Sequence, residues 1–148
     1  LQSINGARCY IAAMCNGMVG EALRGVQAYG QVRHSFGQPL AEHQGWRWRL
    51  AEAATDLAAG RLLVEAAATA IEAGADAQRL AAQAKLFCTR MAERQLAVLT
   101  QAMGAEGLRA QHPFGRHLAG ARVAAYVDGS SEMLLERIAR SMAAQQRV

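Results

Sequence analysis

The spacing of helix-breaking residues constrains this chain more than any other feature. Its two prolines are Pro39 and Pro113, and long alanine-rich stretches lie before, between and after them. Within those stretches apolar residues recur at three- and four-residue intervals, which is the period of an amphipathic helix. Aromatic residues make up 5% of the sequence and β-branched residues are sparse, so the composition favours helices over sheet. The sequence therefore predicts an all-α fold.

Five helices are expected, at about residues 4–31, 40–73, 76–103, 118–124 and 129–145. Four long helices and a short one, joined by short polar breaks, predict an up-and-down helical bundle. The chain has 148 residues, enough for one domain with its own core, and residues 1–148 are expected to form it. The many small residues leave further helix faces available for self-association. In the second helix the expected core-facing stripe consists of Leu50, Ala54, Leu57, Leu62 and Ala66.

A polar break with the sequence RHSFGQP covers residues 33–39. Arg33 offers a forked pair of charge-assisted hydrogen bonds, Ser35 adds a donor, and Gly37 lets the backbone approach a ligand closely. Pro39 is expected to open the next helix, whose N-terminus would add unpaired N–H groups and the positive end of its dipole. This combination suits a phosphate group. An ordinary interhelical turn punctuated by Gly and Pro explains the same residues.

Charge and side-chain spacing limit the classes of partner. The net charge of +4 and the sequence pI near 9.4 suit either nucleic acid or an anionic cofactor. Trp46 and Trp48 would point to nearly opposite sides of a helix, which argues against a nucleic-acid stacking surface. The three cysteines lack metal-ligand spacing, and His112 and His117 have no thiolate or carboxylate at such a spacing, so no metal site is expected.

Three further expectations concern the cellular setting. No stretch is long and apolar enough to suggest a membrane span, which needs about 20 residues, and the first residues do not resemble a secretory signal. The cysteines are expected to be buried, reduced thiols, as in a cytoplasmic protein. Leu1 stands where a complete chain would begin with Met, so we expect the sequence to be part of a longer protein.

Several motifs occur in a fixed order along the chain. They are an arginine at position 8 before an apolar helix, YGQVRHSFGQPL at 29–40, EHQ at 42–44, LAE at 50–52, AK at 84–85, QAMGAEG at 101–107, and DGSSE at 128–132 with IAR at 138–140. In this order and spacing the sequence resembles the C-terminal helical domain of the acyl-CoA dehydrogenase family, over nearly all of its length. The resemblance implies a bundle at the core of a dimer or tetramer. It also implies an N-terminal helical domain and a middle β-domain that this sequence does not contain.

The resemblance implies that Asp128 is catalytic. The family has a carboxylate here, more often Glu, which removes the α-proton of the acyl thioester while the β-hydrogen leaves as hydride to the flavin. Asp is one methylene shorter, and proton transfer is sensitive to such a difference in reach. In another branch of the family the base lies beside the residue that matches Arg8, where this chain has Ala7. A helix N-cap is the structural alternative for Asp128.

The resemblance also assigns a cofactor and its contacts. FAD is implied, with Arg33 and Ser35 contacting the pyrophosphate of an FAD bound to a neighbouring subunit and Phe36 packing nearby. The further assignments are Gln44, Gln101 and Gly104 to the adenosine part, Ser130 and Glu132 to the flavin, and Arg8 and Gly129 to the acyl-CoA substrate. Glu132 also suits the positive end of a helix dipole. Ala105 and Gly120 depart from the family pattern, which usually has Gly and Asp at these positions.

Two functions of different classes follow. The first is the C-terminal domain of an FAD-dependent acyl-CoA dehydrogenase, which oxidises a saturated acyl-CoA to trans-2-enoyl-CoA and passes electrons to an electron-transfer flavoprotein. The second is a non-catalytic oligomerisation domain or partner subunit that keeps the bundle without the chemistry. A flavin monooxygenase on the same fold is a third alternative, in which Asp128 would have no evident use. The isolated chain is expected to be inactive, because the domains that hold much of the flavin and the acyl chain are not part of it.

Overall fold

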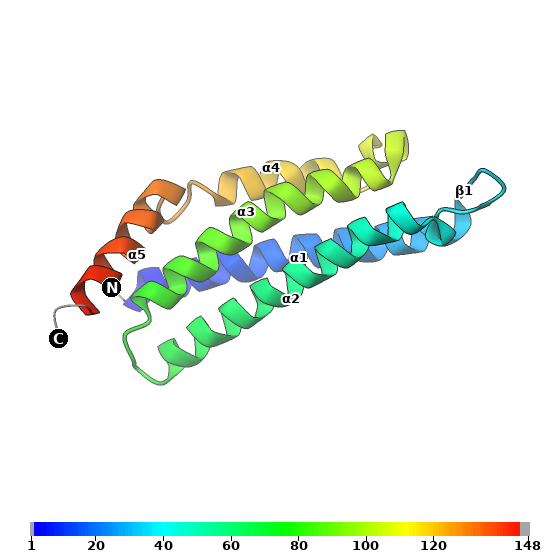
Figure 1. The fold of residues 1–148 in the computed structure, drawn as a ribbon. Helices are drawn as coiled ribbons and strands as arrows, with labels where there is room; N and C mark the ends of the chain where they lie inside the picture. Colours follow the sequence, from blue (N-terminus) through cyan, green and yellow to red (C-terminus); the bar gives the residue numbers. More distant parts are fainter. Residues whose placement is uncertain (1, 146–148) are drawn as a thin grey trace.

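The computed structural model describes residues 2–145, which form five α-helices and a small hairpin (Figure 1). The helices are α1 (Gln2–Val32), α2 (Gln44–Glu72), α3 (Gln78–Ala102), α4 (Phe114–Ala124) and α5 (Ser131–Gln145). The shorter elements are the strands β1 (His34–Ser35) and β2 (Gln38–Pro39) and the 3₁₀ helices η1 (Leu40–Glu42) and η2 (Gly104–Leu108). The prediction of an all-α bundle is confirmed, while both ends of the expected 1–148 domain lie outside the described residues.

α3 is the central helix of the bundle. It packs against α1, α2, α4 and α5, and α1 and α2 also pack against each other. α5 lies at the end of the bundle where α1 begins and α2 turns into α3, whereas the β1–β2 hairpin projects beyond the helices at the opposite end (Figure 1). The bundle therefore has two distinct ends, each with its own loops.

The core lies between α1, α2 and α3 and is built largely from small side chains. Examples from α1 and α3 are Ala12, Cys15, Val19, Ala84, Cys88 and Met91, all fully buried. Small residues let the helices approach closely: a Cβ atom at Gly60 on α2 would lie 2.5 Å from Oδ1 of Asn16 on α1. Close helix packing explains how an alanine-rich sequence forms a dense interior.

The buried side of α2 differs from the prediction. Leu50 and Leu57 are buried as expected, but Leu62 is 66% exposed, and Ala54 and Ala66 are also exposed. The buried positions are Leu50, Ala53, Leu57, Gly60 and Ala67. Alanines occur all around this helix, so hydrophobicity does not mark the face that meets its neighbours.

Several helices begin at other residues than predicted. α2 begins at Gln44, because Pro39 belongs to a strand and the chain first makes η1. α4 begins at Phe114, directly after Pro113, whose ring suits the first turn of a helix. α5 begins at Ser131, because the two residues at 128 and 129 have positive φ and cannot continue a right-handed helix.

The described residues also test two expectations about the cellular setting. None of the described helices combines the length and the apolar character needed to cross a bilayer. Cys9, Cys15 and Cys88 are free and buried, as predicted. Burial raises the pKa of Cys15 to about 11 and that of Cys88 to about 12, so both thiols are protonated at neutral pH.

Candidate functional site

The loop between α4 and α5 presents Asp128. Asp128 has φ 54° and Gly129 has φ 109°, so two consecutive residues adopt left-handed backbone conformations. Asp enters this region more readily than most residues, and glycine does so without steric cost. The hydroxyl oxygen of Ser130 accepts a hydrogen bond from the backbone N–H of Met133 at 3.5 Å, at the start of α5. Ser130 therefore caps α5, and the alternative role of Asp128 as the cap is wrong.

Two buried cations hold the backbone of this loop. Nε of Arg8 on α1 donates to the carbonyl oxygen of Asp128 at 3.2 Å, and Nζ of Lys85 on α3 donates to the carbonyl oxygen of Gly129 at 2.6 Å. Arg8 is 4% exposed and Lys85 is fully buried. Burying a cation is costly unless it is hydrogen-bonded, so the cations and the loop carbonyls stabilise each other. Through these two contacts, α1 and α3 both hold the loop that carries Asp128.

Burial and neighbouring charges set the electrostatics of this site. Burial lowers the pKa of Lys85, Arg8 lowers it further, and the Asp128 carboxylate acts in the opposite direction. The pKa of Arg8 is lowered by burial first and by Arg137 second, again opposed by Asp128. The half-buried Asp128 side chain has no hydrogen-bond or ion-pair partner of its own within residues 2–145. Its oxygens lie near two cations and stay available to a ligand.

Sequence reasoning did not identify Lys85 as a site residue. It is the single lysine of the chain, which otherwise carries arginines and four histidines as basic side chains. It lies within one turn of Ala81, Ala82 and Cys88, all of which are small or apolar. A lysine in the middle of such a stripe is the signal that could have identified it, because lysine is almost never fully buried without a partner.

A second set of predicted residues lines a groove at the hairpin end of the bundle. The groove has a volume of about 470 Å³, and its lining comes from the ends of α1 and α3, from β1, from η1 and η2, and from the first turns of α2. Arg33, Ser35, Gln101 and Gly104 are among the lining residues. The structure thus brings together residues that the resemblance assigned to the pyrophosphate and to the adenosine part of FAD.

Trp46 ties three helices together at this groove. Its Nε1 donates to the carbonyl oxygen of Ala102 at the end of α3, at 3.0 Å. Its ring occupies the space where a residue larger than Gly30 on α1 would place its Cβ atom. Trp46 packs partly buried against the core, whereas Trp48 is 60% exposed. The prediction that the two tryptophans point to different sides is confirmed.

The groove has the chemical features that a pyrophosphate requires. Arg33 and Arg49 line it, and neither guanidinium has an ion-pair or hydrogen-bond partner in the described part of the chain. Gly104 has φ 62° and open space where a Cβ atom would stand, so a ligand can approach its backbone. Two assigned residues do not line the groove: Phe36 is 99% exposed at the hairpin tip, and Gln44 is exposed at the start of α2.

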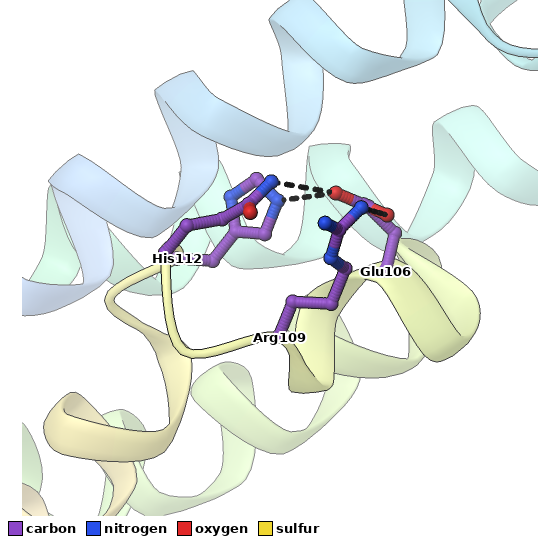
Figure 2. Close-up of polar contacts among 4 residues, drawn as sticks. Glu106, Arg109 and His112 are labelled. Carbon is purple, nitrogen blue, oxygen red and sulfur yellow. Dashed lines mark hydrogen bonds and ion pairs between the residues drawn. The ribbon is translucent and has the colours of Figure 1, made fainter.

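Glu106 organises the loop that borders the groove. Its carboxylate accepts hydrogen bonds from Arg109 at 3.3 Å and Gln111 at 3.2 Å, and Nε2 of His112 lies 2.9 Å from it (Figure 2). The hydrogen bond to His112 lowers the pKa of Glu106, and Arg109 lowers it further. Within residues 2–145 no three His, Cys, Asp or Glu side chains are grouped so as to hold a metal ion. The partner of His112 in this loop is the carboxylate of Glu106.

Comparison with known proteins identifies relatives along almost the whole chain. Residues 1–143 match the family model of the acyl-CoA dehydrogenase C-terminal domain. The chain is 31% identical over 142 residues to a probable short/branched chain specific acyl-CoA dehydrogenase of Dictyostelium discoideum, covering 96% of this chain and 34% of the relative. It is 32% identical over 139 residues to a 3-sulfinopropanoyl-CoA desulfinase of Advenella mimigardefordensis, covering 94% of this chain and 34% of that relative.

The fold is shared with a solved flavoprotein as well. The crystal structure of a glutaryl-CoA dehydrogenase from Mycobacterium smegmatis in complex with FADH2 has a TM-score of 0.90 and 25% identity to this chain, covering 95% of it and 36% of the relative. The chain therefore spans about a third of the length of these relatives. The matched part is the helical bundle described above, and this chain belongs to the acyl-CoA dehydrogenase family as a C-terminal domain.

Proposed function

We propose that this chain is the C-terminal domain of an FAD-dependent acyl-CoA dehydrogenase in which Asp128 removes the α-proton of a saturated acyl-CoA. The observation that carries the proposal is the presentation of Asp128 on a loop that two buried cations anchor. Its carboxylate has no other partner within residues 2–145, and a general base needs a carboxylate oxygen that is free to accept a proton.

The proposed reaction divides the two hydrogens between the carboxylate and the cofactor. FAD, when bound, supplies the acceptor for the β-hydrogen, which leaves with its electron pair. A carboxylate oxygen of Asp128 forms a new O–H bond with the α-hydrogen, and the electrons of the broken α C–H bond form the double bond of trans-2-enoyl-CoA. Arg8 and Lys85 keep the Asp128 loop in place during the transfer.

The groove at the hairpin end is the proposed site for the pyrophosphate and adenosine of FAD. Arg8 lies near the start of α1 and Arg33 directly follows its end, so about 37 Å of helix separates them at 1.5 Å per residue. This separation places the groove and the Asp128 loop at opposite ends of one subunit. It supports a dimer or larger assembly in which the groove of one subunit holds an FAD whose flavin lies near Asp128 of another.

The remaining assigned contacts stay predictions. Ser130 caps α5 and Glu132 lies in its first turn, where the backbone N–H of Glu132 and then the Ser130 hydroxyl lower the pKa of the Glu132 carboxyl. Their proposed contact with the flavin would add to this structural role. Arg8 and Gly129 hold the loop through the contacts described above, and their proposed contact with acyl-CoA would use other atoms. Phe36 and Gln44 would reach FAD from outside the groove.

Replacing Asp128 by Asn in the full-length protein tests the proposal. The amide keeps the size of the side chain and cannot take the α-proton, so we expect the rate of flavin reduction by acyl-CoA to fall about 100- to 10,000-fold. FAD content should be unchanged, because Asp128 does not line the groove. Anaerobic stopped-flow absorbance of the flavin measures the rate, and the absorbance of purified protein gives the FAD content.

A matched control lies eight residues further along the chain, on α5. Glu136 is an exposed carboxylate on α5 that pairs with Arg140 at 2.6 Å, so Glu136→Gln should reduce flavin at the wild-type rate. Near-normal reduction in Asp128→Asn would contradict the assignment of the base. An absence of flavin reduction in the wild type would instead favour the non-catalytic assembly domain, which the exposed large apolar side chains also suit. These include Tyr10, Trp48, Leu62, Val123, Tyr126 and Met133.

A further inference from the structure

The carbonyl groups of the Asp128 loop depend on side chains for their hydrogen bonds. Within residues 2–145 no backbone N–H donates to the carbonyl oxygen of Asp128 or Gly129, and Arg8 and Lys85 are their partners. Both loop residues have positive φ. A backbone in such sparsely populated conformations persists when its surroundings hold it there. The two cations are therefore what fixes this loop.

Lys85 is suited to fix the loop with accuracy. It projects from α3, which packs against all the other α-helices and is the best supported element of the bundle. Its ammonium lies 2.6 Å from the carbonyl oxygen of Gly129, and the side chain is fully buried. Bulk water therefore does not compete for this hydrogen bond. Burial also makes an unpartnered ammonium costly, which favours the conformation in which the contact is made.

We propose that Lys85 is a positioning residue, whose buried ammonium fixes the Gly129 carbonyl and thereby orients the Asp128 carboxylate for proton transfer. This inference rests on the proposed role of Asp128 as the base. Asp has a short side chain, so the place of its carboxylate follows the place of its backbone closely. A misplacement of about 1 Å can slow a reaction about 100-fold, so a single backbone contact is sufficient to control the rate.

Hydrogen–deuterium exchange of the full-length, flavin-loaded protein tests the structural part. Lys85→Met keeps an unbranched side chain that is one atom shorter, and it removes the donor. We expect amides in peptides covering residues 126–133 to exchange faster in this variant, by about tenfold for a lost restraint of roughly 1.4 kcal/mol. Amides of η2, at the other end of the bundle, should exchange as in the wild type.

Single-turnover reduction of the flavin tests the catalytic part. We expect Lys85→Met to lower the reduction rate constant at saturating acyl-CoA about 10- to 100-fold, while the FAD content stays unchanged. Lys85→Arg keeps a cationic donor and should restore most of the lost rate. The rate constant is measured on the flavin-loaded fraction, so a lower yield of folded protein does not obscure it.

Gln95 provides the matched control. It is 4% exposed on the same helix and donates to Asp56, and it lies about 15 Å from Lys85 along α3. Gln95→Met also removes a buried polar group from α3, but it should leave both the loop exchange and the reduction rate unchanged.

The outcomes separate this inference from the proposed function. Wild-type exchange and wild-type reduction in Lys85→Met would overturn the inference. Equal effects of Gln95→Met and Lys85→Met would also overturn it, since both would then act through stability. If Asp128→Asn abolishes flavin reduction while Lys85→Met does not slow it, the inference about Lys85 fails and the proposed function stands. If Asp128→Asn leaves reduction intact, the proposed function fails and the role of Lys85 in catalysis fails with it.

Discussion

At the scale of single residues, the contact between Gly30 and Trp46 has the tightest geometric requirement. Ring atoms of Trp46 occupy the space that the Cβ atom of any larger residue at position 30 would need. The same indole reaches the end of α3 through its hydrogen bond to Ala102. A glycine in a helix is normally unfavourable, and here it lets the indole pack against α1 at the edge of the groove.

Gly30→Ala and Gly25→Ala are expected to change stability in opposite directions. Ala at position 30 overpacks the Trp46 site and should lower the free energy of unfolding by about 1–3 kcal/mol. Gly25 is exposed on the same helix with nothing near its Cβ position, so alanine there should raise the free energy by about 0.5–1 kcal/mol. Urea unfolding followed by the helical circular dichroism signal measures both. Equal effects at the two positions would contradict this account.

At the scale of elements, short loops determine where the groove residues lie. In the hairpin, His34 pairs with Pro39, and the backbone N–H of Leu40 donates to the carbonyl oxygen of Arg33 at 2.8 Å. His43 closes the connection through a 2.9 Å contact between Nε2 and the carbonyl oxygen of Ser35. On the other side, η2 and the Glu106 contacts fix the loop after α3.

The Glu106 contacts predict a pH dependence. The pKa of Glu106 is lowered in the folded protein, chiefly by its hydrogen bond to His112. This group therefore stabilises the fold above the ordinary Glu pKa of about 4.3, and the stabilisation is lost as the pH falls through the lower, folded pKa. We expect the difference in thermal unfolding midpoint between wild type and Glu106→Gln to be constant near neutral pH and to shrink below about pH 4.3.

The exposed Glu52 on α2 provides the control for this pH series. It has no ion-pair or hydrogen-bond partner within the described residues, so Glu52→Gln should differ little from the wild type at any pH. If the difference in thermal unfolding midpoint between wild type and Glu106→Gln does not change with pH, the loop is held by packing and not by the charge of Glu106.

At the scale of the whole molecule, the two ends of the bundle have different proposed tasks. The end with α5 carries Asp128 and its cations, and the hairpin end carries the groove with Arg33 and Arg49 (Figure 1). Within one subunit, about 37 Å of helix separates these two ends at 1.5 Å per residue. The proposal therefore makes assembly part of the function, because each flavin would be completed by residues from two subunits.

Arg33→Gln is expected to lower FAD retention without changing the assembly. A lost charge-assisted hydrogen bond corresponds to about 1.5–3 kcal/mol, or roughly a 10- to 150-fold weaker affinity. Arg47→Gln is the control, since Arg47 is exposed on α2 and does not line the groove. Native mass spectrometry of the full-length protein reports subunits and bound FAD together. If the wild-type protein isolated from its own source instead has a mass that is a multiple of 15.8 kDa and carries no flavin, the proposal is contradicted. That result would support a free-standing assembly domain.

Part of the groove lining could be predicted from the sequence. The family resemblance assigned Arg33 and Ser35, and, later in the chain, Gln101 and Gly104, to one kind of cofactor, and all four line the groove. Their contacts with FAD stay predictions. Lys85 was missed because no property of its own helix shows which loop it meets. That contact depends on how α3 packs against the turn before α5, a tertiary relation that local periodicity does not encode.

The sequence by itself determined the number of long helices, their order and the polar breaks between them, because helix period and helix breakers are local properties. The tertiary structure decided which side of α2 is buried, since alanines on every side give no local preference and neighbours select the face. It also decided the conformation of the Asp128 loop. There, buried cations on two other helices hold carbonyls that the local sequence leaves without partners.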